Sequence, residues 1–305
     1  MSNISVKKIE YKGWKNCLEL SNGTVTLVVT TDIGPRIMSY GFSGKCNVFF
    51  EEEENLGTTG GGVYKTYGGH RLWHAPQVGE RPNEPANDPV EYEISGNSIL
   101  LRQKTEPVSR IQKEMAVTLS PDGTEVTVRH RLVNKHVWPI KTSAWALTTL
   151  APGGVEIIPW VLFKPIDYLP NTALVYWPWT KPNDSRMTFF ERYILLRQIP
   201  ENAEWFKLGM PNREGWAAYV NQTSMFVKTF EHIDGAEYPD HLCSFETFTY
   251  DRMMEIETLS PFAVLPAGSA IESEEKWYLF DNVPTPETEE AIDKNILPLI
   301  RGLKE

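Results

Sequence analysis

The chain has 305 residues, with 30 basic and 40 acidic side chains and a formal net charge of −10. A surface that binds the phosphate backbone needs clustered Lys and Arg, so this composition argues against a nucleic-acid-binding protein. Hydrophobic residues make up 41% and charged residues 23%, which is typical of folded globular proteins and excludes a disordered or fibrous chain.

Short β-rich runs bounded by Gly, Asn, Asp or Pro follow one another along most of the chain. Three short connections, SNGT at 21–24, SGNS at 95–98 and PDGT at 121–124, are typical of hairpin turns. Closely spaced hairpins favour an antiparallel sheet sandwich. The strands predicted are 17–20, 25–30, 37–40, 99–103, 111–119, 125–133, 143–150, 215–221, 225–229, 243–250, 253–259 and 269–280.

Two stretches and the C-terminus depart from this pattern. Residues 51–89 and 178–213 are rich in turn-forming residues and are expected to be long, irregular loops, a kind of segment that is often functional. A helix is predicted over 291–303, after an acidic start at 285–290. We therefore expect one mainly β domain over 1–284 and a C-terminal helical extension, 285–305, packed on it.

The cysteine content and the hydropathy of the chain indicate its cellular compartment. Cys17, Cys46 and Cys243 are too few and too scattered for a disulfide framework, and no CxxC pair is present. The first residues lack an apolar signal region, and no segment approaches 18 consecutive apolar residues. A cytoplasmic protein with no membrane or nucleic-acid partner is expected, and the oligomeric state stays open.

Aromatic residues are abundant, with 10 Trp, 12 Tyr and 13 Phe. Such rings either stack on the C–H faces of sugars or simply pack large β-sheets. Tyr176, Trp177 and Trp179, in an irregular segment, are candidates for a wall over a ligand.

The densest group of chemically active side chains lies in YGGHRLWHAPQ at 67–77. Its two glycines allow a tight turn or a close backbone approach. In an extended segment His70 and His74 lie on one face and Arg71 and Trp73 on the other, so either pair can line a cleft. Sugar or anion binding, a metal site and a structural role are the alternatives, although Pro76 argues against the helix that would bring both histidines to one metal.

A second group lies in CSFETFTYDRMMEIETL at 243–259. Glu246 falls on one predicted strand, and Glu255 and Glu257 lie two residues apart on the next, so they share a face. Neighbouring carboxylates repel, which raises the pKa of at least one and suits a general base. The alternative for Glu255 is a solvated strand face.

Four segments resemble the galactose-mutarotase-like superfamily that includes the aldose 1-epimerases, and within it a bacterial domain family of unknown function. They are DIGPRIMSYGF at 32–42, GGHRLWHAP at 68–76, SAWALTTLAPGG at 143–154 and MEIETLSPFAVLPAGSAIESEEKWYLF at 254–280. The resemblance implies an antiparallel β-supersandwich. It also implies that Glu257, in Ile256-Glu257-Thr258, is the base, because the epimerases carry theirs in a similar Glu-Thr segment.

The resemblance does not extend to the residue that acts as the catalytic acid. The epimerases carry a histidine on the strand that here reads TSAWAL at 142–147, where Trp145 stands instead. His70 or His74 is therefore expected to supply the acid, while Arg71, Trp73 and Trp145 position the sugar, with Glu246 and Glu255 beside them. Arg36, near the pocket rim in the family, is a candidate for holding an acidic group on a sugar.

The sequence thus predicts an aldose 1-epimerase-like protein that interconverts sugar anomers by acid and base catalysis, with a small carbohydrate as its partner. Neither a cofactor nor a metal is expected. The alternatives are a carbohydrate-binding protein without catalysis, because the family histidine is missing, and a lyase or hydrolase of acidic sugars, because of Arg36 and Arg71.

Overall fold

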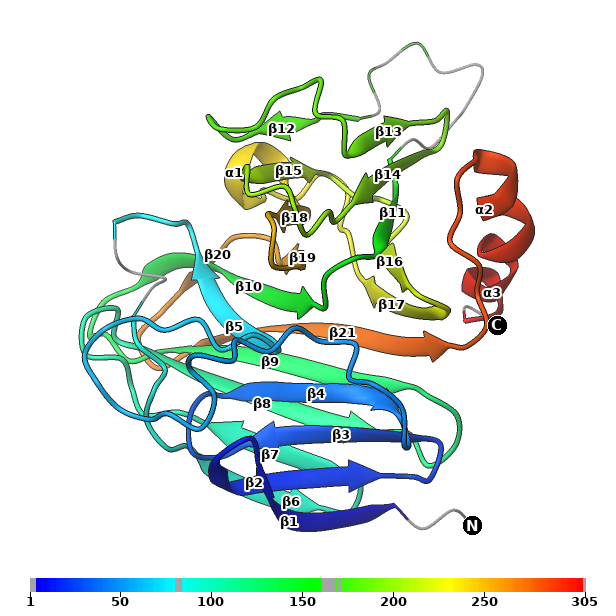
Figure 1. Ribbon diagram of the computed structural model, residues 1–305. Helices are drawn as coiled ribbons and strands as arrows, with labels where there is room; N and C mark the ends of the chain where they lie inside the picture. Colours follow the sequence, from blue (N-terminus) through cyan, green and yellow to red (C-terminus); the bar gives the residue numbers. More distant parts are fainter. Residues whose placement is uncertain (1–3, 80–83, 161–167, 169, 171, 304–305) are drawn as a thin grey trace.

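Two large antiparallel sheets form the molecule. The computed structural model describes residues 4–79, 84–160, 168, 170 and 172–303. In Figure 1 the strands β1 to β4 lie in front of β6 to β9, so the two sheets form two layers. All strand pairs among the described residues are antiparallel.

The first sheet is ordered β1 (Ser5–Tyr11), β2 (Trp14–Ser21), β3 (Val25–Thr30), β4 (Arg36–Phe42), β5 (His70–Ala75), β10 (Ile140–Leu150), β19 (Met254–Leu259), β18 (Phe245–Thr249), β15 (Phe206–Met210) and β12 (Val175–Tyr176), with β20 (Ala263–Leu265) paired to β10. The second is ordered β13 (Met187–Phe189), β14 (Tyr193–Arg197), β11 (Val155–Pro159), β16 (Trp216–Asn221), β17 (Ser224–Phe230), β21 (Ala270–Phe280), β9 (Val126–Asn134), β8 (Ile111–Leu119), β7 (Ser98–Arg102) and β6 (Glu91–Ser95).

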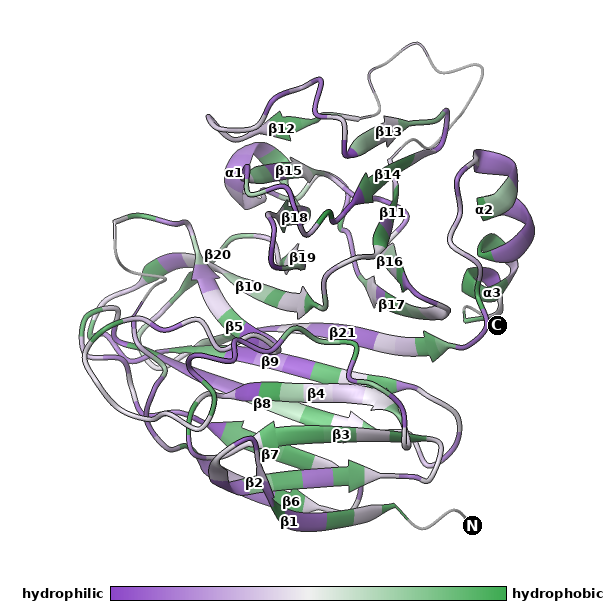
Figure 2. Cartoon of the chain, viewed as in Figure 1, coloured by the Kyte–Doolittle hydropathy of each residue, from purple (hydrophilic) through white to green (hydrophobic). Residues whose placement is uncertain are grey.

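The predicted antiparallel β-supersandwich is confirmed. The three predicted hairpin turns join β2 to β3, β6 to β7 and β8 to β9. Each of the twelve predicted strands overlaps an observed one. Strands of both sheets carry hydrophilic and hydrophobic residues in succession (Figure 2), as expected where one face packs on the core.

The two predicted loops were partly wrong. The first contains β5, and the second contains β13, β14 and β15. Pro178, Pro182, Pro200 and Pro211 suggested irregular backbone, but all four lie before, between or after these strands and none lies inside one. Proline therefore separates short strands here.

Helix is limited in the described residues to α1 (Pro239–Leu242), α2 (Glu289–Asn295) and α3 (Leu297–Gly302). The expected C-terminal helix is present but divided at Ile296. Pro298 has no N–H to donate to the carbonyl of residue 294, so the helical hydrogen bonds cannot run through. None of the described helices has the length and apolar character needed to span a membrane.

Candidate functional site

The register of five neighbouring strands gathers the site on the outer face of the first sheet. Leu147 on β10 lies opposite both Arg71 on β5 and Glu257 on β19, and Glu257 lies opposite Glu246 on β18. Partners in register point to the same face. The carboxylates predicted from 243–259 therefore do share a face with Arg71.

This face forms the floor of a pocket of about 370 Å³. Such a volume is within the range of small-molecule sites. Its lining is charged and aromatic, namely Tyr64, Thr66, Arg71, Trp73, Gln77, Trp145, Leu147, Trp177, Trp179, Trp205, Lys207, Phe248, Tyr250, Met253, Glu255 and Glu257. Of the three aromatic residues considered as a wall over a ligand, Trp177 and Trp179 line this pocket and Tyr176 does not.

Lys207 on β15 is the central cation of the pocket. Its Nζ lies 2.7 Å from Glu246 Oε2 and 2.9 Å from Glu257 Oε2. It also lies 4.7 Å from the ring centre of Trp145 and 4.8 Å from that of Trp177. Burial acts to lower the pKa of Lys207, but the two carboxylates outweigh it and raise the pKa above its ordinary value. Lys207 is therefore protonated at neutral pH.

Glu257 is held from two sides. The Trp145 Nε1–H donates to its Oε2 at 2.7 Å, and Lys207 Nζ donates to both carboxylate oxygens. Burial is the main cause that raises the pKa of Glu257 above its ordinary value, and Glu255 adds to it, while Lys207 and Trp145 oppose the shift. Trp145 thus orients the carboxylate, although it cannot act as the missing acid.

Glu246 completes this group beneath Lys207. Its side chain is fully buried, and burial, together with the charge of Glu257, raises its pKa to about 8 against the opposing pull of Lys207. A glycine, Gly209, faces it on β15, and an added Cβ there would lie 2.5 Å from Cys243 Sγ and 3.3 Å from Glu246 Cγ. The close contact with Cys243 means that a larger side chain at 209 would force its neighbours to shift.

Arg71 and Glu255 form a second ion pair in the pocket. Arg71 Nη1 donates to Glu255 Oε1 at 2.8 Å and to Thr149 Oγ1 at 3.0 Å, and its guanidinium lies 4.8 Å from the ring centre of Trp73. Trp73 in turn packs edge-on against Trp145 at 5.2 Å. Arg71 and Trp73 are therefore the face of 70–74 that the pocket uses.

Arg36 lies next to this group but does not line the pocket. It is opposite Arg71 in register, is 3% exposed, and donates through Nη1 to the Gly68 carbonyl. Its guanidinium also lies 5.4 Å from the ring centre of Tyr67. The expected role at a pocket rim is therefore not supported by its position.

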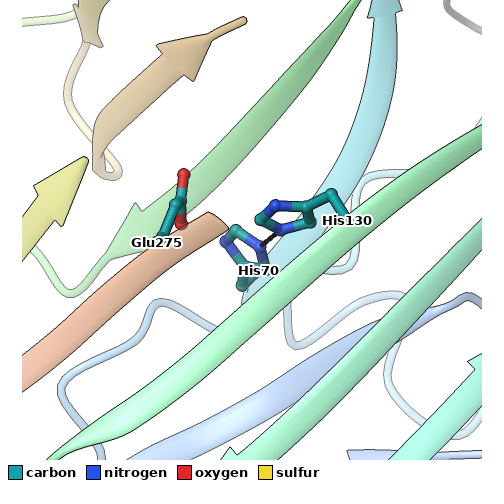
Figure 3. Close-up of side chains that lie close together, drawn as sticks. All are labelled: His70, His130 and Glu275. Atoms are coloured by element: carbon teal, nitrogen blue, oxygen red, sulfur yellow. Dashed lines mark hydrogen bonds between the residues drawn. The ribbon is translucent and has the colours of Figure 1, made fainter. Parts of the chain in front are cut away.

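His70 and His74 lie on the opposite face of the first sheet, because they alternate with Arg71 and Trp73 along β5. The expectation that one of them faces Glu257 is thus corrected. Figure 3 shows His70 beside His130 and Glu275 in the interior of the sandwich. His70 shares a hydrogen bond of 2.7 Å with His130, through the two Nε2 atoms, and one of 2.8 Å with Thr148 Oγ1.

These interior groups have the composition of a metal site, and one ligand atom of each lies within 4.8 Å of the others, but the two histidines already face each other through Nε2. Two imidazole nitrogens bound to one tetrahedral zinc are roughly 3.3 Å apart, whereas those of His70 and His130 are 2.7 Å apart and hold a proton between them. Glu275 is already paired with Lys228 Nζ at 3.1 Å. Burial is the main cause that lowers the pKa of His70 and brings that of His130 to about 4, so both rings are neutral. The cluster is a buried polar network.

His74 lies in a separate buried group between the sheets. Its Nε2 is 3.7 Å from Glu106 Oε2, and the other oxygen of Glu106 is 2.5 Å from Lys113 Nζ. This position gives His74 no route to the pocket.

Lys207 and Trp205 are among the pocket residues that sequence reasoning missed. Lys207 lies in the strand FKLGM at 206–210, and Trp205 directly precedes this strand, in the stretch expected to be irregular. A signal existed, since a lone lysine in a short apolar run costs free energy unless it is paired. Its partners, however, are 39 and 50 residues further along the chain, so nothing local identifies them.

Comparison of the sequence with protein families and with curated proteins finds no match. Solved structures of similar fold do exist. The Slr1438 protein from Synechocystis sp. has a TM-score of 0.60 at 10% identity, over 90% of this chain and 99% of that one. A galactose mutarotase-like protein from Lactobacillus casei has a TM-score of 0.57 at 10% identity, over 87% of this chain and 100% of that one. Another from Clostridium acetobutylicum has a TM-score of 0.55 at 11% identity, over 92% of this chain and 100% of that one. The chain therefore has the galactose-mutarotase-like fold.

Proposed function

We propose that the pocket binds a neutral aldose and interconverts its anomers, with Glu257 as the base and Lys207 as the acid. The observation that carries this proposal is the buried Glu257 carboxylate at the floor of an aromatic-lined pocket, 2.9 Å from the Lys207 ammonium. A protonated donor and a carboxylate with a raised pKa lie side by side, which is what general acid and base catalysis needs.

The reaction conserves every proton. Glu257 takes the proton of the anomeric hydroxyl, the bond between C1 and the ring oxygen breaks, and Lys207 donates a proton to that oxygen. The open-chain aldehyde rotates about the bond between C1 and C2. Reclosure from the other face returns one proton to Lys207 and takes the other from Glu257, so both groups regain their starting states.

The ion pair also makes Lys207 a better acid at the moment it is needed. Glu246 and Glu257 raise the pKa of Lys207. When Glu257 accepts the substrate's proton, its negative charge disappears, so the pKa of Lys207 falls as the ring oxygen begins to need a proton. Such coupling belongs to the pair rather than to either residue.

The charges favour a neutral sugar over an acidic one. Arg71 is already paired with Glu255, and Lys207 with two carboxylates. Arg36, the other cation considered, donates to a backbone carbonyl away from the pocket. A carboxylate on the substrate would meet Glu255 and Glu257, and no cation among the described residues that line the pocket is left unpaired, which disfavours the lyase or hydrolase of acidic sugars.

The test is the rate of anomer interconversion, followed by polarimetry on freshly dissolved aldoses. Glu257→Gln keeps the shape and accepts no proton, so the catalysed rate should fall by at least about 10²-fold while sugar affinity changes little. Glu93→Gln, on an exposed strand, is the matched control and should keep the wild-type rate. Full activity in Glu257→Gln refutes the proposal; binding without any acceleration in the wild type favours a carbohydrate-binding protein.

Lys207 needs a test that separates catalysis from stability. Lys207→Met removes the acid and also leaves two buried carboxylates without a cation, so turnover and melting temperature should both fall. Adding Glu246→Gln removes one of those carboxylates. This double variant should regain stability and no turnover. Regained turnover would give Lys207 a structural role only.

A further inference from the structure

Two of the tryptophans that line the pocket are largely open to solvent. Trp179 is 44% exposed and Trp205 is 56% exposed. Exposed apolar surface that continues from a pocket marks a binding region more often than chance. Both rings belong to the same mouth of the pocket, so what they bind extends outward from the floor.

The two segments that carry these rings are joined by the side chain of Thr180 and the backbone of Lys207. The Thr180 hydroxyl donates to the Lys207 carbonyl at 2.7 Å and accepts from the Lys207 N–H at 2.9 Å. An ion pair of 2.5 Å joins Lys181 to Glu204 on the outer side. The Thr180 hydrogen bonds therefore fix the spacing of the segments that carry Trp179 and Trp205, whereas the exposed ion pair adds little.

Aromatic rings run without interruption from this mouth to the floor. Trp179 packs edge-on against Trp205 at 5.8 Å, and Trp205 packs edge-on against Phe248 at 5.9 Å. Phe248 lies opposite both Lys207 and Glu255 in the sheet, beside the charged groups. We call Trp179, Trp205 and Phe248 the aromatic platform.

We propose that the aromatic platform binds a second sugar ring, so that the ligand is a neutral oligosaccharide whose reducing-end ring occupies the floor beside Glu257 and Lys207. This inference rests on the proposed function, because it places the anomeric carbon at Glu257. A pyranose has apolar C–H faces and a rim of hydroxyl groups. The half-exposed indoles suit that chemistry, since they contact the faces and leave the hydroxyl groups in water.

The separation of charged from uncharged groups in the site supports more than one ring. Its volume of about 370 Å³ falls in the range of roughly 300–1,000 Å³ found for drug-sized ligands. The charged groups Arg71, Lys207, Glu255 and Glu257 belong to the sheet that forms the floor, and the aromatic platform itself carries no charge. One polar ring on the floor and one stacked ring outside it match this separation.

The experiment compares each disaccharide with its own reducing-end monosaccharide by isothermal titration calorimetry. The pairs are glucose with maltose, cellobiose and lactose, galactose with β-1,4-galactobiose, and mannose with β-1,4-mannobiose. At least one disaccharide should bind about three- to tenfold more tightly than its monosaccharide, the scale of one added aromatic contact. Trp205→Ala and Trp179→Ala should each lower disaccharide affinity more than monosaccharide affinity, so that the gain is lost.

Trp138→Ala is the matched control, because Trp138 is 58% exposed and stacks on His136 away from the pocket; it should keep the gain. A gain that survives both platform variants, equal affinities within every pair, or no binding of any sugar would overturn the inference. The proposed function fails separately: a platform-dependent gain without faster anomer interconversion refutes only the catalysis, and monosaccharide catalysis without a gain refutes only the platform.

Discussion

At the scale of single residues, Glu156 on β11 is a buried carboxylate that the proposed chemistry does not use. Its Oε2 accepts from Thr247 Oγ1 at 2.6 Å, whereas Oε1 has no hydrogen-bond partner among the described residues. Burial is the main cause that raises the pKa of Glu156 to about 8, and Glu257 adds like charge. Its protonation therefore changes across the neutral range.

Glu156 should make stability fall as the pH rises. Between about pH 4.5, where the unfolded chain loses this proton, and about pH 8, the folded state still holds it. Raising the pH through that window thus lowers the free energy of unfolding, by up to roughly 1.4 kcal/mol per pH unit. Glu156→Gln has no such proton, so its stability relative to the wild type should rise from pH 5 to pH 8.

Urea denaturation at several pH values measures this difference. Glu93→Gln, at an exposed position, should leave a flat difference across the same range. A flat difference for Glu156→Gln as well would mean that Glu156 is ionised throughout.

At the scale of elements, the Gly-Gly turn sets which face of β5 reaches the pocket. Gly68 and Gly69 have φ values of +85° and +66°. A Cβ on Gly69 would lie 2.2 Å from the Ile37 carbonyl oxygen. The Gly69 N–H donates to Phe50 and its carbonyl accepts from Thr149, both at 2.9 Å. The turn therefore seats β5 against β10 at a fixed register, as the two glycines suggested.

Gly69→Ala should destabilise the protein more than the backbone angle alone explains. Gly123 has a similar φ of +70° with no atom within 4 Å of an added Cβ, so Gly123→Ala reports the cost of the angle. The close contact at Gly69 should add at least about 1–3 kcal/mol, the scale of overpacking. Chemical denaturation of both variants measures the difference; equal losses would show that the turn moves freely.

The same elements show what the sequence can and cannot predict. Alternation along β5 correctly separated His70 and His74 from Arg71 and Trp73. The alternation alone did not show whether the two histidines or Arg71 and Trp73 face the pocket, because polar side chains lie on both faces of β5. That choice depends on long-range partners, such as Glu255 for Arg71 and His130 for His70. Glu257 was found through a resemblance, whereas Lys207 lay in a five-residue strand between prolines.

At the scale of the whole molecule, the second sheet is buried on both of its faces in the part formed by β16 and β17. Along β16, Ala217 and Tyr219 belong to the core between the sheets, whereas Trp216 and Ala218 belong to a second core on the outer face. Both faces need an apolar cover, which explains the nearly continuous apolar runs in these strands. Ile292, Ile296 and Ile300 of the terminal helices supply part of the outer cover.

Because the same strands contribute to both cores, we predict that the helices and the sheets unfold in one transition. Ile296 is fully buried, so Ile296→Ala should lower the free energy of unfolding by about 2–5 kcal/mol. Its thermal midpoint should fall equally by far-UV circular dichroism and by tryptophan fluorescence, to which the five pocket tryptophans contribute as well as Trp216 of the outer core. Ile233→Ala, at a position 46% exposed, should barely move either midpoint. The opposite result would be an early, separate transition for Ile296→Ala while the fluorescence midpoint is unchanged. In that case residues 285–305 form an independent unit, because loss of the outer core would not destabilise the core between the sheets.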